Sequence, residues 1–256
     1  MLPATPPPVL KLYFSRMCPY VHRVTTTLHL LGILTSLAEG MHSSSPLAHV
    51  DLIHIDLANK PEWFKRDINP KGTVPVLIIP NGNGIGGNSV TLADSDDTTA
   101  YLLQVYAGNT RTALLRPQDA LVRYTQAVPL LDTWNDEYVP AFYALLKEQD
   151  KAKVPAAQER LVAAVRAVEA KLAPASEGAF ALGGGELTVV DILCGGFLAR
   201  LPVLKHYRGF DVPVAECARF EAWRKAVVGH PSVQGTLAPV DELVVAYKRL
   251  AGEPTV

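Results

Sequence analysis

The chain has 256 residues, of which 48 % are hydrophobic and 19 % are charged. This length suits one large domain or two modest ones, and the composition is too apolar for a disordered chain and too poor in charge for a coiled coil. The 24 Lys and Arg nearly balance the 25 Asp and Glu, so the net charge is −1. We therefore expect neither nucleic acid nor an anionic membrane as a partner.

The chain offers no sign of membrane insertion or secretion. Its apolar runs, such as Val74–Ile79, are far shorter than the ~20 residues that span a bilayer. The proline-rich start has neither a basic segment nor a long apolar one, which argues against a secretory signal. The three cysteines, Cys18, Cys194 and Cys217, give no disulfide framework. These features predict a cytoplasmic location, where thiols stay reduced.

The first half, up to about Tyr106, alternates strands with helices. The predicted order is β-α-β-α-β-β-α, which is typical of a mixed sheet with helices on its faces. We expect a domain over residues 1–106 and a linker over 107–116. Its strands are predicted at 9–14, 50–55, 75–79 and 90–92, and its helices at 19–32, 61–68 and 94–106.

From Pro117 onward only helical patterns occur, which predicts an all-helical domain over 117–256. Leu161, Val165, Val168 and Leu172 form one apolar helix face. The segment Thr188-Val189-Val190-Asp191 is a capping box that opens another helix. We expect the prolines at 129 and 140 to kink or break the helix in which they occur.

Two stretches have the composition of insertions, Leu34–Ala48 and Asn81–Asn88. The second contains Gly82-Asn83-Gly84-Ile85-Gly86-Gly87, which matches the dinucleotide-binding pattern G-x-G-x-x-G. That function also needs a helix to begin at the last glycine, so that its N-terminus faces the phosphates. The following residues instead have the pattern of a strand, so we interpret the motif as a hairpin loop.

Cys18-Pro19 lies between a predicted strand and a predicted helix. Proline at the first helical position makes Cys18 the N-cap, beside unpaired backbone N–H groups and the positive end of the helix dipole. Helix N-termini lower a cysteine pKa from about 8.5 into the range of ~3.5–7.5, which predicts a reactive thiolate. The alternative is a small apolar cap residue without chemistry. Val21 occupies the position of a second cysteine in a Cys-x-x-Cys pair, so an external thiol must resolve an oxidised Cys18.

The residues around this cysteine resemble those of cysteine-type glutathione transferases, most closely the omega class, with the lambda class and the dehydroascorbate reductases as near relatives. The resemblance extends from about Leu10 to Val233. Its motifs are Leu12-Tyr13-Phe14-Ser15-Arg16, Cys18-Pro19-Tyr20, Asp56-Leu57-Ala58-Asn59-Lys60-Pro61-Glu62-Trp63-Phe64, Asn69-Pro70-Lys71-Gly72-Thr73-Val74-Pro75-Val76-Leu77, Leu92-Ala93-Asp94-Ser95 and Leu114-Leu115-Arg116-Pro117.

This resemblance implies a thioredoxin-like domain with a mixed four-stranded sheet, followed by a helical bundle, which is the glutathione transferase fold. It also implies a homodimer, glutathione as cosubstrate and no metal. The implied glutathione-binding residues, besides the catalytic Cys18, are Pro19, Tyr20, Lys60, Val74, Pro75, Asp94 and Ser95.

The chemistry of these residues suits the roles that the resemblance implies. Val74-Pro75 resembles the family's cis-proline turn, which presents the Val74 backbone for strand-like pairing with the tripeptide. Lys60 matches the lysine that meets the glycyl carboxylate; the alternative is a solvated surface charge. Asp94-Ser95 opens a helix that holds the γ-glutamyl group, unless the pair serves only as a helix cap. The omega class has Glu at position 94, so Asp94 shortens the reach by one methylene.

Several further residues keep two interpretations. Arg200 and Trp223 align with a second-substrate pocket, or are a surface charge and a core aromatic. Asp96 and Asp97 either weaken glutathione binding or face water. For His22, which either stabilises the thiolate or lies on a solvated helix face, we favour the solvated face. Arg16 either adds positive potential near the thiolate or is exposed to solvent. Cys194 and Cys217, in contrast, are predicted to be packing residues.

The predicted function is a glutathione-dependent thiol transferase or reductase that acts through a mixed disulfide on Cys18. Deglutathionylation and dehydroascorbate reduction both follow from this chemistry. One alternative is glutathione conjugation to electrophiles, with Tyr13 or Ser15 as the activating hydroxyl. The other is a non-catalytic ligand carrier or scaffold with the same fold.

Overall fold

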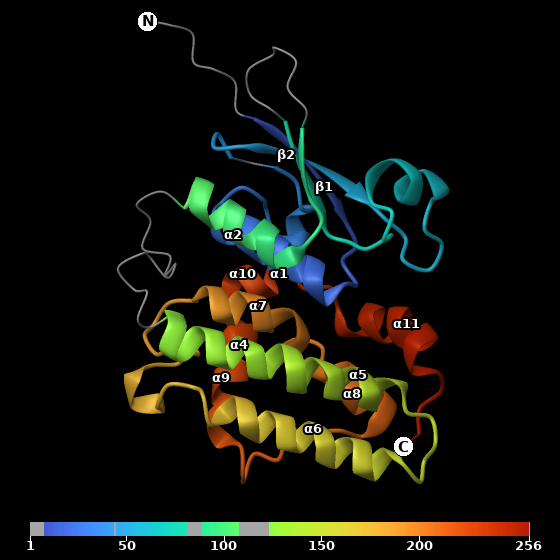
Figure 1. Ribbon diagram of the computed structural model, residues 1–256, viewed down its shortest axis with the longest axis vertical. Helices are drawn as coiled ribbons and strands as arrows, with labels where there is room; N and C mark the ends of the chain where they lie inside the picture. The colour runs from blue at the N-terminus through green and yellow to red at the C-terminus, as the bar shows by residue number, and fades with distance from the viewer. Residues whose placement is uncertain (1–7, 44, 81–88, 108–122, 256) are drawn as a thin grey trace, which may run out of the picture. The chain divides into compact units, whose positions relative to one another are not determined.

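The computed structural model describes residues 8–43, 45–80, 89–107 and 123–255 (Figure 1). The chain divides into two compact units, Met1–Thr110 with Pro231–Leu237, and Arg111–His230 with Ala238–Val256. The predicted insertion Asn81–Asn88, with its predicted hairpin loop, and most of the predicted linker 107–116 lie outside the described residues, so the predicted domain boundary stays a prediction.

A four-stranded mixed sheet forms the centre of the first unit, as predicted. Its strands are β1 (Val9–Phe14), β2 (His49–His54), β3 (Val76–Ile79) and β4 (Val90–Leu92), in the order β2-β1-β3-β4. β1 runs parallel to β2 and antiparallel to β3, and β3 is antiparallel to β4. The central position of β1 fits its burial, because Leu10 and Leu12 are fully buried. The loop that follows β1 therefore starts from a rigid element.

Two helices of the first unit, α1 (Pro19–Leu30) and α2 (Ser95–Tyr106), run side by side (Figure 1). Gly32 follows α1 with a φ of +65°, which the sequence pattern anticipated as the end of this helix. Between β2 and β3, a short helical segment ends in the π-helical turn Phe64–Ile68.

A segment from far along the chain completes this unit. The short helix α10 (Pro231–Gln234) packs on α1, where His22 Nε2 donates to the Val233 carbonyl at 3.0 Å. The hydroxyls of Thr26 and Thr236 are 3.3 Å apart. The expected solvated helix face is therefore wrong, because His22 and Thr26 are both buried. Local periodicity gives no information about a covering segment more than 200 residues away in sequence.

The Leu34–Ala48 stretch packs against the same segment. It contains the 3-10 turn Leu37–Glu39, and the Leu37 N–H donates to the Gly235 carbonyl at 2.5 Å. Met41 is buried with a φ of +41°. This stretch therefore belongs to the hydrophobic core of the first unit and also holds the returning segment.

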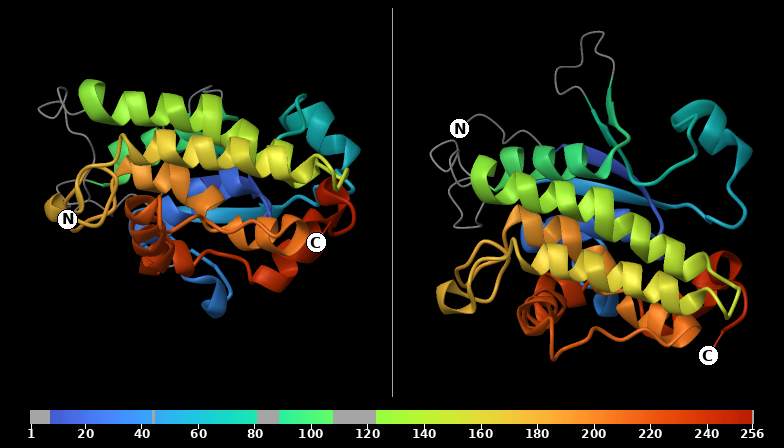
Figure 2. Two further views of the ribbon diagram at one scale, coloured as in Figure 1. Left: turned by 90° about the horizontal axis from the view of Figure 1, so that it is seen from below. Right: turned by 60° about the horizontal axis from the view of Figure 1, so that its bottom comes forward.

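The second unit is helical in its described residues, 123–230 and 238–255. A long helix continues through both prolines, and each proline follows a wider π-helical turn (Figure 2). Such a turn accommodates the missing N–H without ending the helix, so of the predicted kink or break at Pro129 and Pro140 the break does not occur. The segments are Arg123–Ala127 and Trp134–Tyr138 for the π turns, and α4 (Val128–Thr133) and α5 (Val139–Lys147).

The remaining helices pack around an aromatic core. Trp134 stacks on Tyr138 with ring centroids 3.9 Å apart and meets Trp223 edge-on at 5.9 Å. The predicted stripe Leu161–Leu172 and the predicted capping box at Thr188 are both present. The elements are α6 (Val154–Glu169), α7 (Val189–Leu198), α8 (Leu201–Arg208), α9 (Ala218–Gly229) and α11 (Val240–Ala251).

Candidate active site

Cys18 is the N-cap of α1, as the sequence predicted, with extended backbone angles and Pro19 in the first turn. Its N–H donates to the Ser15 carbonyl at 3.0 Å, and its own carbonyl accepts from the His22 N–H at 3.2 Å. The side chain is 9 % exposed. Its Sγ donates to the Val74 carbonyl at 3.7 Å. The loop after β1 thus fixes the cysteine between the start of a helix and the turn before β3.

Two influences act on this sulfur. The start of α1 favours a negative charge through its unpaired amides and its dipole. The side chain, however, makes no capping hydrogen bond to those amides. Only the protonated thiol can donate to a carbonyl, so the contact with Val74 belongs to the neutral form. Formation of the thiolate therefore requires the sulfur to give up Val74.

The turn that faces Cys18 has the predicted form, with a cis peptide bond between Val74 and Pro75. Val74 is buried, and β3 starts two residues later. Gly72 has a φ of +63°, and a Cβ at this position would lie 3.3 Å from Lys65 Cγ and 3.8 Å from Lys60 Cδ. The stems of Lys60 and Lys65 thus pass over the backbone that leads to Val74.

The start of α2 shows how Asp94 and Ser95 are used. Asp94 is the N-cap, and its Oδ1 accepts from the backbone N–H groups of Asp96 at 2.7 Å and Asp97 at 3.2 Å. Ser95 is buried, and its hydroxyl donates to Asp96 Oδ1 at 3.2 Å. Asp94 therefore acts as a helix cap here, and it already occupies two of the amides that were expected to meet a ligand carboxylate.

A buried arginine that the sequence reasoning missed connects the two helix starts. The guanidinium of Arg23 donates to Ser95 Oγ at 3.1 Å and pairs with Asp96, and it lies 4.9 Å from the centroid of the Tyr20 ring. Burial raises the pKa of Tyr20, so its hydroxyl is neutral at physiological pH. An arginine three residues after Tyr20, on the same helix face, was the available signal.

The two predicted second-substrate residues are both fully buried. Arg200 Nη1 donates to the Gly196 carbonyl at 2.6 Å, and Trp223 Nε1 donates to Asp191 Oδ1 at 2.6 Å. These contacts favour the core interpretation of Trp223. Full burial also contradicts a surface charge at Arg200. Their assignment to a substrate pocket stays a prediction.

The two hydroxyl residues considered for conjugation are buried as well. The Tyr13 ring packs 5.7 Å from Phe64 and 6.1 Å from Trp63, centroid to centroid. Ser15 is 2 % exposed, and its carbonyl accepts from the N–H of Cys18.

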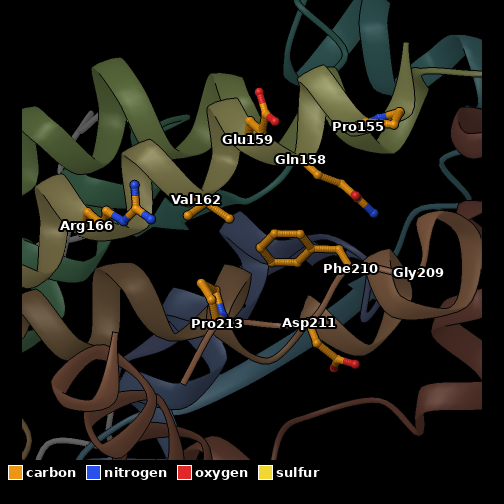
Figure 3. Close-up of a pocket in the computed structure, with 9 residues that line it drawn as sticks. All are labelled: Pro155, Gln158, Glu159, Val162, Arg166, Gly209, Phe210, Asp211 and Pro213. Atoms are coloured by element: carbon orange, nitrogen blue, oxygen red, sulfur yellow. The ribbon is translucent and has the colours of Figure 1, made fainter. Parts of the chain in front are cut away.

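A separate pocket of about 720 Å³ lies in the second unit, between α6 and the loop after α8 (Figure 3). The ring of Phe210 projects from this loop toward α6. None of the predicted site residues lines this pocket. Among the described residues, no cluster of His, Cys, Asp and Glu is suited to hold a metal ion. The described helices are also too short or too polar to cross a membrane.

Most of the first unit matches a known protein family. Residues 17–104 match the sequence profile "Glutathione S-transferase, N-terminal domain". This segment is a glutathione S-transferase N-terminal domain. It contains Cys18, Val74, Asp94 and Ser95, and it ends within α2.

The relatives of this chain include glutathione transferases of the omega and lambda types. Glutathione S-transferase L3 of Arabidopsis thaliana is 26 % identical over 93 % of this chain and 86 % of its own length. Glutathione S-transferase omega-1 of Sus scrofa is 25 % identical over 89 % of this chain and 80 % of its own. Glutathione transferase Omega 1C of Trametes versicolor superposes with a TM-score of 0.70 at 22 % identity, over 96 % of this chain and 97 % of its own. This last likeness shows that the chain has the glutathione transferase fold.

Proposed function

We propose that the protein is a glutathione-dependent thiol transferase and reductase in which Cys18 is the nucleophile. The observation that carries this proposal is the position of Cys18 at the start of α1, with its sulfur against the Val74 carbonyl. The relatives of omega and lambda type support glutathione as the cosubstrate.

The reaction needs one cysteine and two glutathione-derived sulfurs. The Cys18 thiolate attacks the glutathionyl sulfur of a mixed disulfide, a new S–S bond forms, and the substrate thiolate leaves and takes up a proton. A glutathione thiolate then attacks the glutathionyl sulfur on Cys18, which releases glutathione disulfide and restores the Cys18 thiolate. The substrate disulfide is reduced, and the two glutathionyl groups leave joined as one disulfide. Val21 takes no part because it has no thiol.

Dehydroascorbate reduction is a variant with the same nucleophile. The Cys18 thiolate adds to a carbonyl carbon of the substrate, and glutathione attacks the sulfur of this thiohemiketal. The C–S bond breaks, its electron pair and a proton go to the substrate, and Cys18 becomes glutathionylated. A second glutathione completes the cycle, so two glutathiones are oxidised for each substrate reduced.

The proposed glutathione seat uses residues of the first unit. The Val74 backbone pairs with the cysteinyl part of the tripeptide, Lys60 meets the glycyl carboxylate, and Asp94 with Ser95 receives the γ-glutamyl group. Pro19 and Pro75 shape the turns on either side, and Tyr20 offers a neutral hydroxyl. If the tripeptide N–H takes the Val74 carbonyl, it competes with the Cys18 thiol for that acceptor. Glutathione binding then removes a contact that favours the unreactive form.

Two measurements test this function. Treatment with glutathione disulfide at neutral pH, followed by intact-protein mass spectrometry and peptide mapping, is expected to give one glutathione adduct, on Cys18. Wild type and C18S are then compared on a glutathione mixed disulfide and on a chlorinated electrophile. Loss of reduction in C18S, with or without a gain of conjugation, supports the proposal. Unchanged reduction in C18S contradicts it, and an absence of glutathione binding in calorimetry would indicate the carrier or scaffold.

The proposal includes the cellular compartment and the oligomeric state of the protein. The cycle consumes reduced glutathione, which fits the cytoplasm. A homodimer follows from the family resemblance, and sedimentation of the purified chain tests it.

A further inference from the structure

We propose that Arg23 is a positioning residue of the glutathione site, which makes the start of α2 able to accept the γ-glutamyl carboxylate. This inference rests on the proposed function. It assigns a role to a residue that lies outside the predicted binding set, five positions after Cys18 in α1.

The charge at the start of α2 creates the need for such a residue. Asp94 at the N-cap and Asp96 and Asp97 in the first turn put three carboxylates at the start of α2, where a carboxylate ligand is expected. Asp94 uses its Oδ1 to cap the backbone. Asp96 accepts from the Ser95 hydroxyl, so its negative charge lies next to the group that is predicted to bind the ligand. An uncompensated Asp96 would repel a second carboxylate.

Arg23 provides the compensation. Its side chain is 3 % exposed, and the Asp96 side chain with which it pairs is 47 % exposed. The same Nη1 also donates to Ser95 Oγ at 3.1 Å, so one guanidinium fixes the hydroxyl and neutralises the neighbouring carboxylate. Because the cation is buried, solvent and salt screen it little.

The guanidinium also reaches the other side of the site. It lies over the Tyr20 ring at 4.9 Å, and Tyr20 belongs to the predicted glutathione-binding set beside Cys18. Arg23 therefore touches one predicted binding residue from α1 and one from α2. Its removal is expected to affect glutathione affinity more than the chemistry at the sulfur.

The test is a double-mutant cycle of R23M and D96N in the full chain, with reduced glutathione as the ligand. R23M is expected to raise the calorimetric Kd and the KM for glutathione roughly tenfold, while kcat and the rate of Cys18 alkylation change by less than about threefold. R23M/D96N removes the exposed charge together with its partner and is expected to recover most of the affinity. D96N completes the cycle. R23M/D97N is the matched control, because it removes the neighbouring exposed carboxylate of the same helical turn, whereas Arg23 pairs with Asp96.

The outcomes separate the two proposals. Wild type that binds no glutathione overturns the proposed function and this inference with it. Wild type that binds, with an unchanged Kd in R23M, overturns this inference alone, and so does equal rescue by D96N and D97N. If R23M does not fold, R23K keeps the buried charge but loses the planar group, and it is expected to raise the Kd several-fold without lowering kcat; an unchanged Kd in R23K overturns the inference.

Discussion

The Cys18 thiol lies 3.7 Å from the Val74 carbonyl, although 56 positions separate the two residues in the chain. This contact places the proposed nucleophile against the backbone that the tripeptide is expected to use. A carbonyl of the main chain cannot be removed by substitution, so the relationship is best tested from the sulfur side.

Substitution of Cys18 by serine separates the contact from the chemistry. Serine keeps a donor for Val74 but is a far weaker nucleophile than a thiolate. We expect C18S to unfold with a free energy within about 1 kcal/mol of wild type and to lose thiol transfer by at least about a hundredfold. C18A, which also loses the donor, is the matched comparison. Urea unfolding and a mixed-disulfide assay measure both effects, and retained transfer in C18A would move the nucleophile elsewhere.

Lys60 is expected to recognise the glycyl end of glutathione. K60M should raise the Kd for glutathione roughly tenfold, because a charge-assisted hydrogen bond to a carboxylate is lost. The same variant should bind the glycyl ethyl ester of glutathione as wild type does, since the ester carries no charge there. Lys65 gives the control, because its stem crosses Gly72 beside that of Lys60. Equal losses in K60M and K65M would contradict a specific role of Lys60.

Gly235 lets the segment Pro231–Leu237 approach α1. A Cβ at this position would lie 2.8 Å from His29 Nε2 and 2.9 Å from the Pro231 carbonyl. We expect G235A to lower the free energy of unfolding by about 1–3 kcal/mol, because the segment must move away from α1. In G229A the new methyl meets nothing within 4 Å, and this variant should be neutral or slightly stabilised. Urea unfolding of both variants checks the difference, and similar curves would show that the segment tolerates the methyl group.

The elements that sequence patterns anticipate here are those whose cause is local. The strand Val9–Phe14 and the cap at Cys18-Pro19 both follow from period and capping chemistry. The capping box from Thr188 to Asp191 also carries its own signature in four residues.

The features that could not be predicted from the sequence depend on contacts between residues that are far apart in the chain. Arg23 gains its role only when α2 arrives, more than 70 residues later. Arg208 is fully buried and donates to the carbonyls of Leu146, at the end of α5, and Ala251, at the end of α11. An isolated arginine predicts a solvated charge, and only the tertiary fold shows that it closes two helix ends. The same reason applies to His22, which is covered by a segment more than 200 residues away in sequence.

Glu221 is expected to make the free energy of unfolding depend on pH. Its carboxylate accepts two hydrogen bonds of 2.6 Å from Arg224, and these hold the pKa of Glu221 below its ordinary value. A lowered folded pKa contributes stability above the unfolded pKa of about 4.3 and loses it as the pH falls through the folded value. The free energy of unfolding should therefore fall between about pH 5 and pH 3, and less steeply in E221Q. Urea unfolding across this range is the measurement, with the exposed E186Q as a control that should follow wild type; parallel slopes in all three would exclude the contribution.

Asp191 and Trp223 allow the two interpretations of Trp223 to be separated. The Asp191 carboxylate is fully buried and accepts from Trp223 Nε1 at 2.6 Å, the Thr188 N–H at 2.7 Å, the Thr188 hydroxyl at 2.6 Å and the Ala181 N–H at 2.9 Å. D191A leaves all four donors unsatisfied and should cost at least about 3 kcal/mol, whereas T188A should cost about 1 kcal/mol.

W223F removes one of these donors and keeps most of the aromatic packing. If Trp223 is a core residue, W223F should lower the free energy of unfolding of the protein by about 1–2 kcal/mol. The decrease should be smaller in the D191N background, because the two side chains share one hydrogen bond. If Trp223 is a pocket residue, W223F should instead change the KM for the second substrate while the unfolding curve stays in place. Unfolding and KM measured on W223F, D191N and the double variant decide between them. The full burial of both side chains leads us to expect the coupled loss of stability.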